Sequence, residues 1–223
     1  MMHQDKIDLH GPFDNSRRNS GKLMSIIFQK MKPVIERYIN HTDGDLPFFY
    51  NERANVGLLA AAAWAAGAAC IEEYRTNKSH SSDIKKKVYG RGDLYVSFGE
   101  EVLLIEAKNN WIFLKSRRST IESQFSKSIE KAIKDARRAT EDGHLIALSF
   151  FVPHLNNAER LADPESFVRE RFADLENFIT KLDGKNTTAS YRIKKYDDMC
   201  FKDDTRGLMV WPGMIVIASE LRN

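Results

Sequence analysis

Hydrophobic and polar residues recur with two different periods along this chain. Apolar side chains return every three or four positions over residues 21–40 and 120–141, and this spacing predicts two amphipathic helices. A third helix is expected over residues 51–66, which begin with an Asn suited to capping a helix and are followed by Gly67. A fourth helix is expected over residues 164–182.

Runs of β-branched, aromatic and other apolar residues predict the strands. They cover residues 69–74, 94–98, 102–105, 145–152, 190–195 and 208–218. The run at 145–152 is apolar throughout, which favours a strand buried on both faces. The polar segment 75–87 is expected to be a loop, and Trp211-Pro212-Gly213 is expected to bend the last strand. Because helices and strands alternate, we predict an α/β fold with a mixed central β-sheet flanked by helices.

A tight hairpin is predicted where the strands at 94–98 and 102–105 meet. The two residues between their pairing positions begin with Gly99, and a Gly at the first central position suits a type II′ turn. A turn of this length sets the register of the hairpin. It would pair Phe98 with Glu101.

That register would bring three charged residues together. Asp93 lies directly opposite Glu106, and Lys108 shares the face of Glu106 because side chains alternate along a strand. Like charges directly opposite each other destabilise a sheet unless a cation lies between them. Two carboxylates and an amine at the end of an apolar strand therefore indicate a metal site and point to phosphodiester chemistry.

Composition and charge narrow the class of protein. The chain has 223 residues, of which 42% are hydrophobic and 29% charged, and its net charge is +3. These values are ordinary for a globular domain. We expect a flexible tail over residues 1–20 and a single domain over 21–223, with its core at about 46–155. The two cysteines and six histidines lack metal-ligand spacing, the start lacks a signal peptide, and no apolar stretch is long enough to span a bilayer, so we expect a cytoplasmic protein without a membrane partner.

The order of elements and motifs resembles the PD-(D/E)xK nuclease superfamily over residues 50–152. In that superfamily a helix with a Glu precedes a strand, an Asp-bearing strand, a strand ending in (Asp/Glu)-x-Lys and a helix. Here Glu52, Asp93 and the triplet Glu106-Ala107-Lys108 match those positions. The chain looks most similar to archaeal Holliday-junction resolvases, which share a Glu-Arg helix start, and it is also similar to restriction-type endonucleases.

This resemblance implies Mg²⁺-dependent hydrolysis of a phosphodiester bond, with DNA as the expected substrate and Mn²⁺ able to replace Mg²⁺. Asp93, Glu106 and the carbonyl of Ala107 would hold the metal, with Glu52 directly or through water. Lys108 would orient or deprotonate the attacking water. These residue types suit the chemistry, because Mg²⁺ prefers hard oxygen ligands and lowers the pKa of a bound water.

Two features depart from the commonest pattern of the superfamily. Gly92 stands where most members have Pro before the Asp. Glu72 and Glu73 compete with Glu52 for the role of the first-motif carboxylate. Glu52 is preferred because it precedes the strand between the motifs, whereas Glu72 and Glu73 lie on that strand.

Basic residues follow the third motif with few acids among them. The candidate nucleic-acid contacts are Lys115, Arg117, Arg118, Gln124, Lys127 and Lys131. The resemblance places Gln124 in this set, because some members keep a Gln or Lys near the metal. Such a run suits phosphate contacts along a duplex and suits a solvated helix face equally well.

Two functions of different classes stay open. The first is a metal-dependent nuclease, acting either in restriction or phage defence or in repair and recombination. The second is a catalytically silent nuclease-like module that binds nucleic acid or a protein partner. The presence of every motif residue favours the nuclease. The segments outside the core suit target recognition or a homodimer interface.

Overall fold

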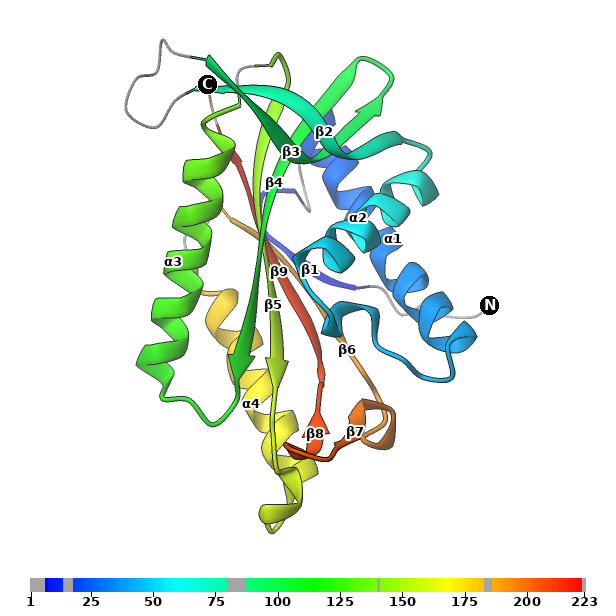
Figure 1. Cartoon of the computed structure of the whole chain (residues 1–223), viewed down its shortest axis with the longest axis vertical. Helices are drawn as coiled ribbons and strands as arrows, with labels where there is room; N and C mark the ends of the chain where they lie inside the picture. Colours follow the sequence, from blue (N-terminus) through cyan, green and yellow to red (C-terminus); the bar gives the residue numbers. More distant parts are fainter. Residues whose placement is uncertain (1–6, 14–17, 80–86, 140, 183–185, 222–223) are drawn as a thin grey trace.

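In the described part of the chain, seven strands form one mixed β-sheet in the order β1-β6-β9-β5-β4-β3-β2 (Figure 1). The computed structural model describes residues 7–13, 18–79, 87–139, 141–182 and 186–221. The strands of the sheet are β1 (Asp8–His10), β2 (Ala69–Ser79), β3 (Lys87–Phe98), β4 (Glu101–Phe113), β5 (His144–His154), β6 (Thr187–Arg192) and β9 (Gly213–Leu221). A separate antiparallel ribbon is made by β7 (Cys200–Asp203) and β8 (Gly207–Val210). Strands β4 and β5 run parallel, and the other paired strands of the described chain run antiparallel.

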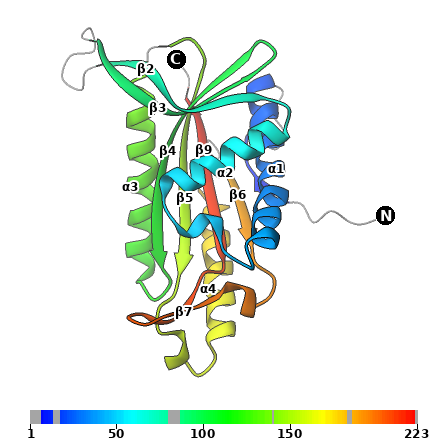
Figure 2. The ribbon, with the colours of Figure 1, turned by 45° about the vertical axis from the view of Figure 1, so that its right-hand side comes forward.

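Helices cover both faces of this sheet. They are α1 (Asn19–His41), α2 (Glu52–Ala65), α3 (Arg118–Ala136) and α4 (Pro164–Ile179), with the short 3₁₀ turns η1 (Pro47–Phe49), η2 (Ala158–Arg160) and η3 (Asp197–Met199). Consecutive strand residues point to opposite faces. On β4 the side chain of Asn109 bonds to Asn55 of α2, whereas that of Asn110 bonds to Ser128 of α3, so these two helices lie on opposite faces (Figure 2). The predicted α/β fold with a mixed sheet is confirmed.

Local sequence signals position the helix that carries the first motif. The side chain of Asn51 accepts a hydrogen bond from the backbone N–H of Ala54, as an N-cap does. Helix α2 ends at Ala65, and Gly67 follows with φ +86°. Both predicted ends of this helix are therefore confirmed. Helix α3 ends at Ala136, five residues before the predicted end.

The hairpin between β3 and β4 has the predicted register. Gly99 adopts φ +60°, as the first central position of a type II′ turn requires, and Phe98 pairs with Glu101. Strand β5 is buried along most of its length, as its apolar run predicted. The chain also breaks at the predicted place, where Trp211 and Pro212 separate β8 from β9 and Gly213, the first residue of β9, has φ +152°. The segment expected to be one bent strand therefore forms two strands, which belong to different sheets.

Two predictions about irregular segments are wrong. Residues 75–79 do not belong to a loop, because β2 continues to Ser79 and β3 begins at Lys87; the alternation of the exposed Arg75 and Asn77 with the buried Thr76 extends the strand pattern. The described part of the predicted tail is also ordered, since β1 pairs with β6. Residues 1–6 and 14–17 of that tail lie outside the described chain.

None of the described helices combines the length and the apolar character that crossing a bilayer requires. The hydrophobic core lies between the sheet and the helices on its two faces. On one side α1 and α2 pack together, and on the other the ring of Phe125 on α3 contacts that of Phe178 on α4 at 5.6 Å between centroids.

Candidate active site

A fork in the sheet creates the candidate site. Strands β3 and β4 pair from Phe98 and Glu101 as far as Leu94 and Ile105, and there the pairing ends. Beyond this point β3 stays with β2, whereas β4 stays with β5 (Figure 1). The next residues of β4 therefore have no strand neighbour on the β3 side.

Two carboxylates accept the hydrogen bonds that these residues of β4 would otherwise donate to a neighbouring strand. The Oδ2 atom of Asp93 accepts a hydrogen bond from the backbone N–H of Ala107 at 2.7 Å. The Oε2 atom of Glu52 accepts one from the N–H of Asn109 at 3.0 Å. Buried backbone donors need such partners, because leaving them unpaired costs free energy. Two predicted site residues from distant parts of the chain thus meet on three residues of β4.

The ammonium group of Lys108 lies at the same point. Its Nζ donates to the carbonyl oxygen of Ala107 at 2.7 Å and pairs with Asp135 of α3 at 3.1 Å. Burial lowers the pKa of Lys108, but the nearby carboxylates of Asp93, Asp135 and Glu52 outweigh it and raise this pKa above its ordinary value. Lys108 is therefore held as a cation.

Glu106 is buried and bonded to a residue that the sequence did not indicate. Its Oε1 atom lies 2.6 Å from Nζ of Lys78 on β2, and the side chains are 5% and 13% exposed, respectively. Burial raises the pKa of Glu106, and the charge of Asp93 adds to this, while Lys78 opposes it. Asp93 and Glu106 are therefore close enough to interact, although the backbone pairing stops one pair before them.

Lys78 reaches the site because β2 and β3 continue as a paired ribbon past the fork. The backbone of Lys78 forms a bridge with Ala139, just after α3, and the N–H of Asn77 donates to Glu141 at 2.7 Å. The aliphatic part of the Lys78 side chain passes over Gly90, where a Cβ would lie 3.1 Å from its Cδ. The alternation of residues 75–78 was the signal that could have extended β2 to this residue.

Tyr74 of β2 borders the site, and its ring lies against Gly92 of β3. Tyr74 pairs with Gly92 across the two strands, and its ring covers the glycine so closely that any Cβ there would overlap it. Burial raises the pKa of the Tyr74 phenol, as do the charges of Glu106 and Asp93. A Cβ at residue 92 would therefore require the Tyr74 ring to move. Sequence reasoning missed Tyr74.

Amide and hydroxyl side chains brace β4 from both faces. Asn55 of α2 donates to the side chain of Asn109 at 2.9 Å and to the carbonyl of Phe48. On the other face Asn110 donates to Ser128, which bonds to Ser149 of β5 at 3.1 Å. These contacts hold the end of β4 in one position between α2 and α3.

The competing carboxylates lie in a neighbouring cavity of about 280 Å³. Its lining comes from α2, β2 and β3 and comprises Asn51, Glu52, Arg53, Val56, Glu72, Glu73 and Asp93. Glu73 has φ +52° and pairs with Arg91 of β3 at 3.6 Å. The carboxylate of Glu72 lies over Gly57. Of the three candidates for the first motif, Glu52 is the one bonded to the backbone of β4.

The donor set fits Mg²⁺ in chemical type. Asp93, Glu106, Glu52 and the carbonyl of Ala107 supply oxygen atoms, which are the ligands that Mg²⁺ prefers. Within the described part of the chain, no three His, Cys, Asp or Glu side chains gather closely enough to hold a metal ion. Protein donors already occupy each predicted ligand, with Lys78 on Glu106 and Lys108 on Ala107.

Burial also shifts the proton affinity of Glu52. It raises the pKa of this carboxyl, and Asp93 adds to the effect, whereas Lys108, the N–H of Asn109 and Lys131 lower it. Lys131 on α3 therefore lies within electrostatic reach of the site. Lys127 precedes it by one helical turn and is exposed on the same side of α3.

The other predicted nucleic-acid contacts lie in different surroundings. Gln124 is one turn before Ser128, and its Oε1 is buried without a hydrogen-bond partner in the described chain. Arg117 is the exposed N-cap residue of α3. Lys115 is close enough to η2 to help lower the pKa of Glu159, behind the effects of backbone hydrogen bonds. The structure thus spreads these residues over more than one surface.

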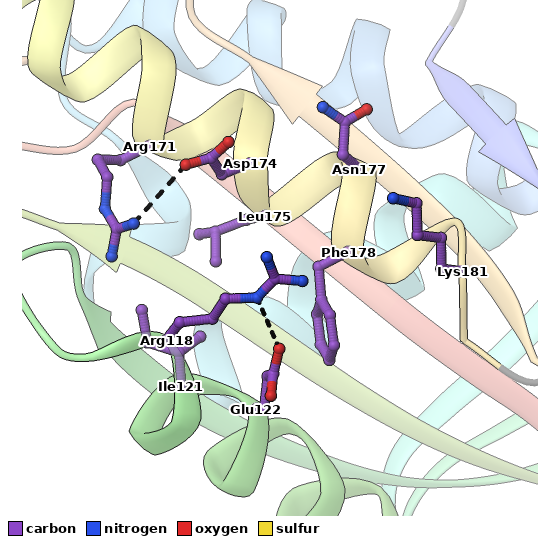
Figure 3. A pocket seen from close by; sticks show the side chains of 9 residues that line it. All are labelled: Arg118, Ile121, Glu122, Arg171, Asp174, Leu175, Asn177, Phe178 and Lys181. Carbon is purple, nitrogen blue, oxygen red and sulfur yellow. Dashed lines mark hydrogen bonds and ion pairs between the residues drawn. The ribbon is translucent and has the colours of Figure 1, made fainter.

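Arg118 lines a second cavity, of about 400 Å³, between α3 and α4 (Figure 3). It donates to Glu122 at 2.8 Å within α3. Across the cavity, Arg171 pairs with Asp174 and also donates to the carbonyls of Leu114 and Ser116. The charged side chains Arg118, Glu122, Arg171 and Asp174 of this cavity are therefore paired with other groups of the protein.

Comparison with models of known protein families, with curated proteins and with solved structures finds no match for this chain.

Proposed function

We propose that this protein is a metal-dependent nuclease that hydrolyses phosphodiester bonds in DNA. The observation that carries the proposal is the convergence at the fork: Asp93, Glu52 and Lys108 all bond to the backbone of residues 107–109, beside the buried Glu106. Strands β2 to β5 with α2 and α3 would form a restriction-endonuclease-like core, as the resemblance to the PD-(D/E)xK superfamily implies.

In this proposal the oxygens of Asp93, Glu106 and Ala107 would hold Mg²⁺ or Mn²⁺, and Glu52 would complete the set directly or through water. A cation bound there would polarise a phosphate and lower the pKa of a coordinated water. The carboxylates that now accept hydrogen bonds from N–H groups have further lone pairs available to a metal.

Lys108 has a more specific role than its position in the sequence indicates. Its pKa is raised by Asp93, Asp135 and Glu52 against the effect of burial, so the amine stays protonated near neutral pH. A protonated amine cannot accept a proton from water. We assign Lys108 to orienting the water and stabilising charge on the phosphate, because its ammonium is held between the carbonyl of Ala107 and the carboxylate of Asp135.

A specific observation favours the alternative, a catalytically silent module. Lys78 already pairs with Glu106, and Lys108 already occupies the carbonyl of Ala107, so cations of the protein itself engage two of the predicted metal ligands. Such a module would bind nucleic acid or a protein partner through the surface around α3 without cutting.

Cleavage assays separate the two functions. Purified protein is incubated with duplex, single-stranded and branched DNA, with Mg²⁺, with Mn²⁺ and with excess chelator. A nuclease cuts at least one substrate in a metal-dependent way, and the preferred shape distinguishes a junction resolvase from a restriction-type enzyme. Binding without cleavage under every metal condition identifies the silent module.

A further inference from the structure

We propose that Lys78 is a built-in counter-ion of Glu106 that a divalent cation must displace, and that it thereby sets the metal affinity of the site. This inference rests on the proposed function, because it takes Glu106 to be a metal ligand. Lys78 would act on the metal through Glu106 and is in that sense a positioning residue.

Lys78 and Glu106 form a close and largely buried ion pair. The Lys78 Nζ and Glu106 Oε1 atoms are 2.6 Å apart, and both side chains are almost completely shielded from solvent. An isolated carboxylate in such surroundings is strongly unfavourable, and a hydrogen-bonded cation offsets this cost. Lys78 therefore stabilises an ionised Glu106 when no metal is bound.

The surrounding structure positions Lys78 beside Glu106. Its backbone is fixed by the bridge to Ala139, and its side chain lies against Gly90. A side chain at residue 90 would narrow the space that the Lys78 methylene groups use. The other ammonium of the site, that of Lys108, is bonded to Ala107 and Asp135 instead.

Lys78 and a metal bound to Glu106 would compete for the same carboxylate oxygen, Oε1. A metal bound to Glu106 and the ammonium of Lys78 would carry like charges within a few ångströms of each other, and both require the same carboxylate. The amine must then leave Oε1. Lysine has a long flexible stem, so it can move without a change in the sheet.

Calorimetric titration with Mn²⁺, without nucleic acid, tests this competition. We compare the wild type with Lys78→Met, and with Lys202→Met as a matched control, because Lys202 is exposed on β7. If Lys78 competes with the metal, Lys78→Met binds Mn²⁺ more tightly than the wild type by roughly 5- to 150-fold, the usual range of coupling between two ligands. The control binds like the wild type.

A purely structural role for Lys78 predicts the opposite sign, because a misplaced Glu106 would bind metal more weakly. Affinity that is equal to or weaker than the wild type in Lys78→Met therefore overturns the inference. Lys78→Gln keeps a hydrogen-bond donor near Glu106 without the charge and should also bind Mn²⁺ more tightly, so the test does not depend on one variant folding. Lys78→Arg keeps the charge and should retain weak binding.

Thermal unfolding gives a second readout. Without metal, Lys78→Met leaves a buried carboxylate unpaired and should unfold at a lower temperature than the wild type. With Mn²⁺ its unfolding temperature should rise more than that of the wild type, because tighter binding to the folded state stabilises it more. An equal rise in both proteins contradicts the inference about Lys78 but does not contradict the proposed nuclease function. If neither protein binds Mn²⁺ or gains stability from it, the proposed nuclease function is overturned as well.

Discussion

Asp93 and Glu52 occupy positions where a neighbouring strand would otherwise supply hydrogen-bond acceptors. Each satisfies one backbone N–H of β4, at Ala107 and Asn109. Replacing either carboxylate therefore removes both a candidate metal ligand and a backbone partner. For this reason stability has to be measured alongside activity in any variant of these residues.

Two glycine substitutions test the packing around the site. Gly92→Ala would place a methyl group in the ring of Tyr74, and such overpacking costs about 1–3 kcal/mol. Gly57→Ala lies inside α2, where a Cβ would be 3.9 Å from the Glu72 carboxylate, so it should gain about 0.5–1 kcal/mol from helix propensity. Urea denaturation measures both changes. A Gly92→Ala variant as stable as the wild type would show that Tyr74 can move aside freely.

The raised pKa of Glu106 predicts a definite dependence of stability on pH. Burial raises this pKa, so the folded protein binds the Glu106 proton more tightly than the unfolded chain does. The contribution of Glu106 to the free energy of unfolding is then largest at low pH, and it declines as the pH rises from the ordinary carboxyl value through the raised one.

Glu106→Gln removes the titrating group together with the negative charge that pairs with Lys78, so the test is how the difference in stability varies with pH and not its absolute size. The free energy of unfolding of the wild type minus that of Glu106→Gln should fall over the pH interval that begins at the ordinary carboxyl pKa, about 4, and extends upward. Urea denaturation at several pH values measures it. A difference that rises over this interval would mean that the folded state lowers the pKa of Glu106, and the assigned effect of burial would be wrong.

At the level of elements, α3 presents two distinct faces. Lys131 acts electrostatically on Glu52, and Lys127 lies one turn before it. Arg118 instead lines the cavity shared with α4 and pairs with Glu122 (Figure 3). If nucleic acid reaches the fork along α3, it should contact the face of Lys127 and Lys131.

The salt dependence of DNA binding tests this assignment. The double variant Lys127→Ala, Lys131→Ala should bind DNA more weakly and should reduce the slope of log affinity against log salt by as much as about 2, because each phosphate contact contributes about 0.9. Fluorescence anisotropy with labelled DNA and a chelator measures the slope. Lys30→Ala, an exposed position on α1, serves as the control. An unchanged slope in the double variant would place the DNA elsewhere.

Local signals were sufficient to predict the elements around the site. Gly99 determined the hairpin turn and its register, and Asn51 with Gly67 determined the ends of α2. Each of these signals acts within a few residues, so it can be recognised in the sequence. The continuation of β2 to Ser79 was missed because the basic composition of the segment obscured its alternation, and Lys78 was missed with it.

At the scale of the whole molecule, the sheet order depends on contacts between distant segments. Strand β9 lies between β5 and β6, and β1 joins the edge beside β6. Ile7 and Leu9 are buried and alternate with the polar Asp8 and His10, but this pattern is short and lies in a segment of polar composition that suggested a tail. No local pattern reveals which distant strand will bury such a segment. The same holds for the fork, which exists because β3 leaves β4 to follow β2.

The nuclease assignment is tested most directly by single-turnover cleavage of the preferred DNA substrate with Mg²⁺ or Mn²⁺. We compare the wild type with Asp93→Ala and Lys108→Ala, and use the exposed Lys202→Ala as a control. We predict that both site variants cleave more than about 100-fold more slowly, because even residues that only support a metal site typically change activity by 10- to 100-fold. The control should cleave at the wild-type rate. Cleavage that persists undiminished in both Asp93→Ala and Lys108→Ala would contradict the assignment of the active site to the fork.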